Sequence, residues 1–249
     1  MYRFFANLQN IDPSDGSIKL NIEDTEHIRV LRLRPNEHFI VCDGNGIDYT
    51  CRLGEHDDTS IAEIISQARS QGEPTVKCSV FSAYQKGERL DYLVQKSVEL
   101  GVFEIVLFKS ERCIAVPKDE QKKLARLRRI ALETAKLSGR GRVPSVTSAG
   151  RFKDAIKTAA GGFALPLFFY ESEDNLHIKD VLEKHFLPAV NDENSISIIT
   201  GPEGGFEPHE VESARMEGFK IVSLGPRILR SETAPAVALA AIMYHTDNL

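Results

Sequence analysis

The chain has 249 residues, with 31 Lys or Arg against 36 Asp or Glu, so its formal net charge is −5. Hydrophobic residues make up 42% and charged residues 27%, which is typical of globular proteins and excludes an intrinsically disordered chain. No apolar run reaches the roughly 18 residues of a membrane span, and the first residues lack the features of a signal peptide. We expect a cytoplasmic protein without a membrane partner, whose cysteines are reduced and lack the spacing of metal ligands.

Residues 1–70 predict a small β-barrel, because short segments of strand pattern alternate with turn residues. Asp43-Gly44-Asn45-Gly46 is typical of a hairpin turn. Residues 23–33 predict a short helix, with Asp24 or Thr25 as its N-cap. The predicted strands are 3–5, 18–20, 38–42, 47–53 and 60–65.

Residues 75–249 alternate strand and helix patterns, and a polar segment at 68–74 precedes them. This alternation predicts an α/β domain with a mostly parallel sheet that is covered on both faces. We expect strands at 76–83, 103–108, 163–170, 196–200 and 221–224, and helices at 88–100, 120–137, 208–216 and 234–245.

Several common catalytic signatures are missing from this second part. It has no GxGxxG after its first strand, no GxxxxGK[ST] and no GxSxG. The missing motifs argue against a Rossmann dinucleotide site, a P-loop and an α/β-hydrolase. The sequence also has no HExxH zinc motif, so we expect no metal.

Two glycine-rich segments, Thr200–Gly205 (TGPEGG) and Leu224–Ala234 (LGPRILRSETA), each follow a predicted strand and precede a predicted helix. Glycine lets a ligand approach the backbone, and ligands of open α/β sheets bind beyond the carboxyl ends of the strands. Each segment alone could be a connecting turn, and Glu232 or Thr233 could only cap the last helix. Together they favour one ligand pocket built from two adjacent loops.

Basic residues gather in two segments although the whole chain is acidic. Residues 118–144 hold nine basic and three acidic residues, and residues 27–34 hold three arginines and no acid. Either cluster alone could be a solvated surface, but together they favour anion binding, with nucleic acid the leading candidate.

The two glycine-rich segments resemble the signature of the SPOUT methyltransferases, and more narrowly that of the RsmE-like family. Four further segments are similar to that family, namely His27–Leu33, Gln95–Gly101, Ser110–Cys113 and Ala131–Pro144. One departure is Pro35-Asn36-Glu37, which stands where the family often has a glycine followed by an acid.

This resemblance implies a PUA-like RNA-binding β-barrel at 1–70 and a SPOUT α/β trefoil-knot domain at 75–249. It implies that a homodimer methylates N3 of a uridine in 16S ribosomal RNA of the small ribosomal subunit, with S-adenosylmethionine as the donor. The residues assigned to the donor are Thr200, Gly201, Glu203, Gly204, Gly205, Leu224, Gly225, Ile228, Leu229, Arg230, Thr233 and Ala234. The residues assigned to RNA are Arg3, Arg29, Arg32, Arg34, Arg126, Arg129, Lys136, Arg140 and Arg142.

Uridine N3 carries a proton at neutral pH, so methylation requires a base or a group that stabilises the developing anion. Arg230 could stabilise the anion and Glu232 could accept the proton, directly or through water. The competing interpretations are that Glu232 caps a helix and that Arg230 forms a structural ion pair with it. Three other functions stay open: methylation of transfer RNA or of a ribose 2′-hydroxyl, RNA binding without catalysis, and a nucleotide-binding oxidoreductase, which the missing fingerprint disfavours.

Overall fold

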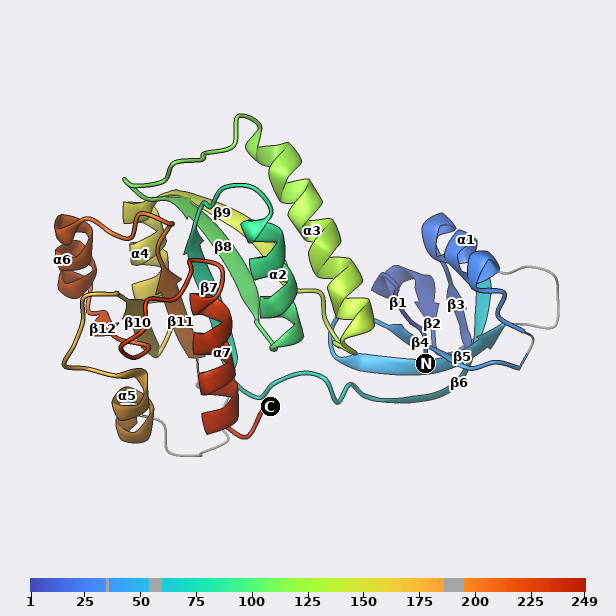
Figure 1. Cartoon of the computed structure of the whole chain (residues 1–249). Helices are drawn as coiled ribbons and strands as arrows, with labels where there is room; N and C mark the ends of the chain where they lie inside the picture. Colours follow the sequence, from blue (N-terminus) through green and yellow to red (C-terminus); the bar gives the residue numbers. More distant parts are fainter. Residues whose placement is uncertain (35, 54–59, 186–194) are drawn as a thin grey trace. The chain divides into compact units, whose positions relative to one another are not determined.

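A computed structural model describes residues 1–34, 36–53, 60–185 and 195–249 of the chain (Figure 1). The described residues form two compact units, of which the first comprises Met1–Glu73 and Glu133–Val143. The second unit comprises Pro74–Leu132 and Pro144–Leu249. The segment Glu133–Val143 therefore packs with the first unit, although its position in the sequence lies within the second.

The first unit is built on a six-stranded sheet with the order β1-β4-β5-β6-β3-β2. The pairs are antiparallel except for β1 and β4, which are parallel. The predicted hairpin is confirmed, since β4 pairs with β5 across residues 43–46. The strands are β1 Arg3–Phe5, β2 Ile11–Asp12, β3 Ser17–Lys19, β4 Phe39–Cys42, β5 Ile47–Leu53 and β6 Ile61–Arg69.

One helix, α1 Ile22–Leu31, covers the core of this sheet through Ile28, which packs with Phe4, Ile18 and Phe39. A short 3-10 turn, η1, spans Leu8–Asn10. The N-cap of α1 is Asn21, whose side-chain oxygen accepts the Asp24 N–H at 2.7 Å. The two caps predicted from the sequence, Asp24 and Thr25, are therefore wrong, because the helix begins earlier and both residues lie inside it. The Pro35 of the unusual tripeptide lies outside the described residues.

The second unit is built on a six-stranded sheet with the order β12-β10-β11-β7-β8-β9, in which every pair is parallel. The central strands β7 and β11 are almost wholly buried, as expected where helices cover both faces. The strands are β7 Lys77–Ala83, β8 Glu104–Lys109, β9 Ser145–Arg151, β10 Leu165–Phe169, β11 Ser195–Thr200 and β12 Lys220–Val222.

Helices lie on both sides of this sheet (Figure 1). The side chains of Phe81, Phe108 and Phe168 form one core with Phe152 and Ile156 of α4. Strand residues alternate between the faces, and α7 packs against β7 and β11 and contacts α2 and α5. The helices are α2 Arg89–Glu99, α3 Glu120–Leu137, α4 Phe152–Gly161, α5 Ile178–His185, α6 Pro208–Met216 and α7 Ala234–His245.

Three of the basic residues assigned to RNA are held inside the first unit by carboxylates. Arg3 donates two hydrogen bonds to Asp48, at 2.6 and 2.7 Å. The Lys136 ammonium lies 2.9 Å from Asp24, and both side chains are at most 10% exposed. Arg140 donates through Nε and Nη2 to Glu73, at 2.8 and 2.9 Å, and only 2% of its side chain is exposed.

Groups so paired and enclosed present little charge to a phosphate, so these contacts favour a structural role for the three residues, and their assignment to RNA stays a prediction. The Glu73 carboxylate additionally accepts the backbone N–H of Gly141 at 2.8 Å. The polar atoms of the Arg140–Glu73 pair are thus well matched inside the unit, as a buried ion pair requires.

The Arg140–Glu73 pair predicts the stability of an Arg140→Ala variant. Removing one member of a buried pair leaves the other uncompensated, so we expect the free energy of unfolding to fall by about 3–5 kcal/mol. Urea denaturation of the full chain measures this change. Arg129→Ala is the control, since Arg129 is exposed on α3, and an equal loss in both variants would contradict the structural role of Arg140.

Candidate active site

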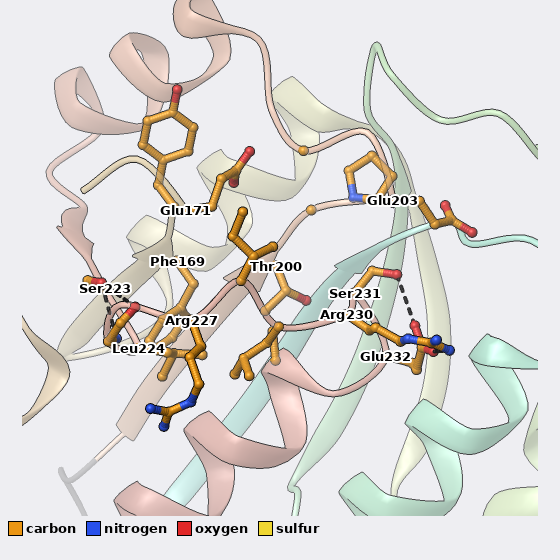
Figure 2. A pocket seen from close by; sticks show the side chains of 18 of the residues that line it. Phe169, Glu171, Thr200, Glu203, Ser223, Leu224, Arg227, Arg230, Ser231 and Glu232 are labelled. Atoms are coloured by element: carbon orange, nitrogen blue, oxygen red, sulfur yellow. Dashed lines mark hydrogen bonds and ion pairs between the residues drawn. The ribbon is translucent and has the colours of Figure 1, made fainter. Parts of the chain in front are cut away.

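A pocket of about 650 Å³ opens at the carboxyl ends of the parallel strands in the second unit (Figure 2). The segments that follow β10, β11 and β12 line it, together with Arg89 at the start of α2. This is the position at which open α/β sheets bind ligands. Figure 2 shows Arg227 and Leu224 at one end of the pocket and Arg230 and Glu232 at the other, with Thr200 between them.

The pocket brings together the two glycine-rich segments that the sequence singled out. Of the residues assigned to the donor, all except Thr233 line it. Thr233 stands at the N-cap position of α7, where its side chain makes no capping hydrogen bond. Pro202, Pro226, Arg227 and Ser231 of these segments also line the pocket. The lining residues outside the segments were not predicted, namely Arg89, Phe169, Tyr170, Glu171, Asp174 and Ser223.

The Glu203 carboxylate ties the loop after β11 to the start of α2. Its Oε1 accepts the backbone N–H of Lys86 at 2.8 Å and a hydrogen bond from Arg89 Nη1 at 2.5 Å. Burial alone would raise the pKa of Glu203, but the hydrogen bonds from Lys86 and Arg89 outweigh it and hold the pKa below the ordinary value of 4.5. Glu203 is therefore ionised at neutral pH and acts as an anchor for two elements.

Gly205 fits the pocket because it lacks a side chain. Its φ angle is +68°, and a Cβ built there would lie 2.2 Å from Glu171 Oε1. Any larger residue would be strained and would displace the Glu171 carboxylate from the pocket wall. The glycine thus permits the loop after β11 to approach the loop after β10.

The residues that line the pocket suit a nucleoside-like ligand. Leu224, Leu229 and Phe169 supply apolar surface, and the glycines of the two segments let a ligand come close to the backbone. Two lining atoms, Thr200 Oγ1 and Glu203 Oε2, are buried and have no hydrogen-bond partner among the described residues. Buried polar atoms in proteins are nearly always satisfied, so these two atoms mark places for a ligand's or a water's hydrogen bonds.

The two residues predicted to be catalytic, Arg230 and Glu232, lie on the same loop at one end of the pocket (Figure 2). Arg230 Nη1 lies 3.9 Å from Glu232 Oε1, and Arg89 Nε lies 3.7 Å from Glu232 Oε2. The Glu232 side chain is 12% exposed, whereas that of Arg230 is 81% exposed. An ion pair with so exposed a partner contributes little to stability, which weakens the structural interpretation of Arg230.

The remaining basic candidates differ in their surroundings. Arg126 donates to Asp91 of α2 at 3.1 Å, so its charge is partly neutralised. Exposed side chains are found at Arg29, Arg32, Arg34 and Arg129, and Arg142 is half-buried.

No group of three or more His, Cys, Asp or Glu side chains is placed to hold a metal ion in the described part of the chain. Within the same residues, no helix combines the length and apolar character that crossing a membrane requires.

Comparison with known proteins gives matches to both units. Residues 71–243 match the RNA methyltransferase domain family, and residues 20–65 match the RNA methyltransferase PUA domain family. The ribosomal RNA small subunit methyltransferase E of Mesomycoplasma hyopneumoniae is 34% identical over 94% of this chain and 95% of its own length. The enzyme of the same name from Bacillus subtilis is 29% identical over 100% of this chain and 98% of its own.

Solved structures agree with these sequence matches. The ribosomal RNA small subunit methyltransferase E of Neisseria gonorrhoeae, bound to S-adenosyl methionine, superposes with a TM-score of 0.83 at 32% identity, covering 98% of this chain and 97% of that one. A methyltransferase of Legionella pneumophila in complex with the same cofactor gives a TM-score of 0.82 at 26% identity, covering 98% and 97%.

The parallel sheet, its pocket and the matched domains define a SPOUT-type RNA methyltransferase domain that carries a PUA-like domain, so the predicted fold class is confirmed. More narrowly, the chain belongs to the ribosomal RNA small subunit methyltransferase E family.

The low pKa of Glu203 predicts an acid-sensitive anchor. A carboxylate whose pKa is lowered in the folded state stabilises that state at pH values above 4.5, and this contribution is lost as the pH falls through the folded-state pKa. We expect the Glu203→Gln variant to have a lower melting temperature than the wild type at pH 7. Below pH 4.5, its melting temperature should decrease less with falling pH than that of the wild type. Thermal unfolding between about pH 3 and 7 checks this, and parallel curves for both proteins would contradict it.

Proposed function

We propose that this chain transfers a methyl group from S-adenosylmethionine to N3 of a uridine in 16S ribosomal RNA of the small ribosomal subunit. The observation that carries the proposal is the pocket formed by both glycine-rich segments, in a chain of this family. The same cofactor is bound in related structures that align over nearly the whole chain.

The donor would be held by the loops of this pocket. The apolar residues Leu224, Ile228, Leu229 and Ala234 would pack against its adenine, and the glycines would admit close backbone contacts. Thr200 and Glu203 each offer its polar groups an oxygen that has no hydrogen-bond partner among the described residues. We now place Thr233 outside this set and add Phe169 and Glu171, which line the pocket.

The reaction requires that uridine N3 lose its proton before it attacks. The N3–H bond breaks as Glu232 accepts the proton, directly or through a water molecule. The electron pair left on N3 forms the new N3–CH₃ bond, while the sulfur–methyl bond breaks and its electrons leave a neutral thioether. Arg230 stabilises the negative charge that develops on the uracil, and its exposed position lets it reach an incoming base.

RNA would contact the exposed arginines of the first unit. Arg29, Arg32 and Arg34 lie at or just beyond the end of α1, and Arg32 has a left-handed backbone (φ 53°) that ends the helix. Phosphate contacts of this kind position an RNA without reading its sequence. On α3 and beyond it, Arg126, Arg129 and Arg142 remain candidates for the same role.

We further propose that the protein acts as a homodimer in the cytoplasm. The last helix, α7, is apolar around its whole circumference, and Val237 and Tyr244 are exposed on it. Such a face in a described helix suits contact with a second copy. None of the four cysteines is paired in a disulfide, which suits a reducing compartment.

Methyl transfer from labelled S-adenosylmethionine tests the function directly. The substrates are small ribosomal subunits and 16S ribosomal RNA made without this modification, with bulk transfer RNA as the comparison. We expect label to appear as N3-methyluridine in ribosomal RNA. Label in transfer RNA or on a 2′-hydroxyl would overturn the substrate, and binding of RNA without any transfer would overturn the catalytic function.

The two proposed catalytic side chains predict distinct kinetic losses. Glu232→Gln keeps the shape but removes the proton acceptor, so kcat should fall by about 10²–10⁴-fold. Arg230→Ala removes one stabilising charge, so kcat should fall by about 10²–10³-fold. Single-turnover methyl transfer at saturating donor measures both changes, and the Kd for the donor should stay unchanged in Glu232→Gln. An equal loss of donor affinity would show that these residues only shape the pocket.

The arginines beyond α1 predict a salt-dependent contribution to RNA binding. Removing one phosphate-binding cation should reduce the slope of log K against log salt by roughly 0.7–1, so Arg32→Gln/Arg34→Gln should reduce it by at most about 2. Filter binding of ribosomal RNA over a range of salt concentrations measures this slope. Arg215→Gln on α6 is the matched control, and an unchanged slope in the double variant would remove these residues from the interface.

A further inference from the structure

A second hollow lies next to the donor pocket in the same unit. Its lining comes from the start of α2 and from the loop before α7, and its volume is about 670 Å³. The hollow is more open than the donor pocket and carries both basic and acidic side chains. Its lining residues are Lys86, Glu88, Arg89, Tyr92, Arg230, Glu232 and Thr233.

The two cavities share part of their walls. Arg89, Arg230 and Glu232 line both of them, so the hollow meets the donor pocket at the end where the proposed proton acceptor lies. A group seated in the hollow would therefore lie against Glu232 and beside the donor pocket. A methyl acceptor must lie next to the donor, as this position allows.

Tyr92 is an exposed aromatic side chain at this site. It is 44% exposed although it lies on α2, whose opposite side is buried through Leu90, Leu93 and Val94. Lys96, one turn further along the helix, holds its ammonium 6.0 Å from the centre of the Tyr92 ring. An exposed aromatic ring on a rigid helix is a surface on which a nucleic-acid base can stack.

Lys86 has a fixed backbone and an exposed side chain. Its N–H is bound to Glu203 at 2.8 Å, which anchors the residue at the rim of the hollow. A lysine ammonium is a point charge that suits a carbonyl oxygen or an oxyanion. A uracil that loses its N3 proton spreads negative charge onto O2 and O4, so a cation beside it favours that loss.

We propose that this hollow receives the target base, a pyrimidine turned out of the RNA, with Tyr92 as its stacking surface and Lys86 as a contact to a carbonyl oxygen. The inference rests on the proposed function and adds to it the place and the residues that bind the acceptor. An extruded base needs such a surface, because it has lost the stacking of its neighbours. Tyr92 and Lys86 are positioning residues, whereas Glu232 exchanges the proton.

The first test compares full-length variants in methyl transfer to unmodified small ribosomal subunits. Base–aromatic stacking corresponds to a loss of roughly 5- to 150-fold when the ring is removed. We expect Tyr92→Ala to lower kcat/KM for the RNA within this range, and Tyr92→Phe to restore most of it. The Kd for S-adenosylmethionine should be unchanged in both. Wild-type activity in Tyr92→Ala, or an equal loss in the Phe variant, would overturn the stacking role.

Lys86→Ala should lower kcat/KM and shift its pH profile toward higher pH, since the uracil anion would lose a stabilising charge. Lys179→Ala on α5 is the matched control, because Lys179 is 78% exposed and does not line the hollow. An unshifted profile in Lys86→Ala would overturn the carbonyl contact.

The second test does not depend on methyl transfer. Ribosomal RNA transcribed with 5-iodouridine is bound to the full-length protein and irradiated, and the cross-linked peptide is found by mass spectrometry. We expect a cross-link at Tyr92 and none at Tyr244, an exposed tyrosine of α7 outside the hollow. Cross-links confined to other residues would overturn the base site. A cross-link at Tyr92 in a protein that methylates no RNA would uphold the base site and reject the proposed function.

Discussion

Both cavities depend on the hydrogen bonds that the ionised carboxylate of Glu203 accepts, because these bonds hold the segments that line them. The carboxylate accepts the Lys86 N–H and a hydrogen bond from Arg89, so the loop after β11 is fixed to the segment between β7 and α2. Arg89 then reaches Glu232 at 3.7 Å, which brings in the loop after β12. Three chain segments far apart in the sequence thus meet through one half-buried charge, and these donors offset its desolvation cost.

The first unit uses its charges in a comparable way. Lys136 and Arg140 belong to the most basic stretch of the sequence, yet their partners Asp24 and Glu73 enclose them. Both basic residues lie in the segment that joins the first unit from far along the chain. Since a buried charge without its partner is costly, each pair favours the arrangement in which that segment is docked on its own unit. A cluster of basic residues in this sequence therefore includes residues of the unit's interior as well as residues of its surface.

Much of the second unit could be predicted from the sequence, because its signals are local. The continuous apolar strands and the ends of α3, α6 and α7 follow from hydrophobic periodicity and from proline and glycine at the boundaries. The strand β9 was missed because its sequence, SVTSAGR, is largely polar, as an edge strand permits. The helix α4 does carry a helical pattern of buried residues at Phe152, Ala155, Ile156 and Ala159, so that signal was available and was overlooked. α5, another helix that was not predicted, has only eight residues, too few to show a clear period.

In the pocket, too, only those residues could be predicted that have a local signal in the sequence. Glycine-rich segments identified the two loops, because glycine has a local conformational signature. Arg89 and Glu171 could not be found in this way, since their importance lies in contacts with Glu203 and Gly205, which are distant in the sequence. The burial of Lys136 and Arg140 could not be predicted either, because the sequence shows a charged residue but not the residue with which it pairs.

The proposed reaction also explains why the catalytic end of the pocket combines an enclosed carboxylate with an exposed guanidinium. Methyl transfer from a sulfonium to a uracil anion removes both charges, so a site that bound the anion too tightly would stabilise the reactants more than the transition state. Glu232 lies between Arg89 and Arg230, at 3.7 and 3.9 Å, and its negative charge weakens the pull of each on an incoming base. In the proposed reaction Glu232 would lose its charge on taking the N3 proton, and both guanidinium groups would then act on the newly formed anion. The electrostatic potential at the base would thus become more positive at the step that creates the anion. Proton transfer and this change in potential are coupled because the three side chains lie close together.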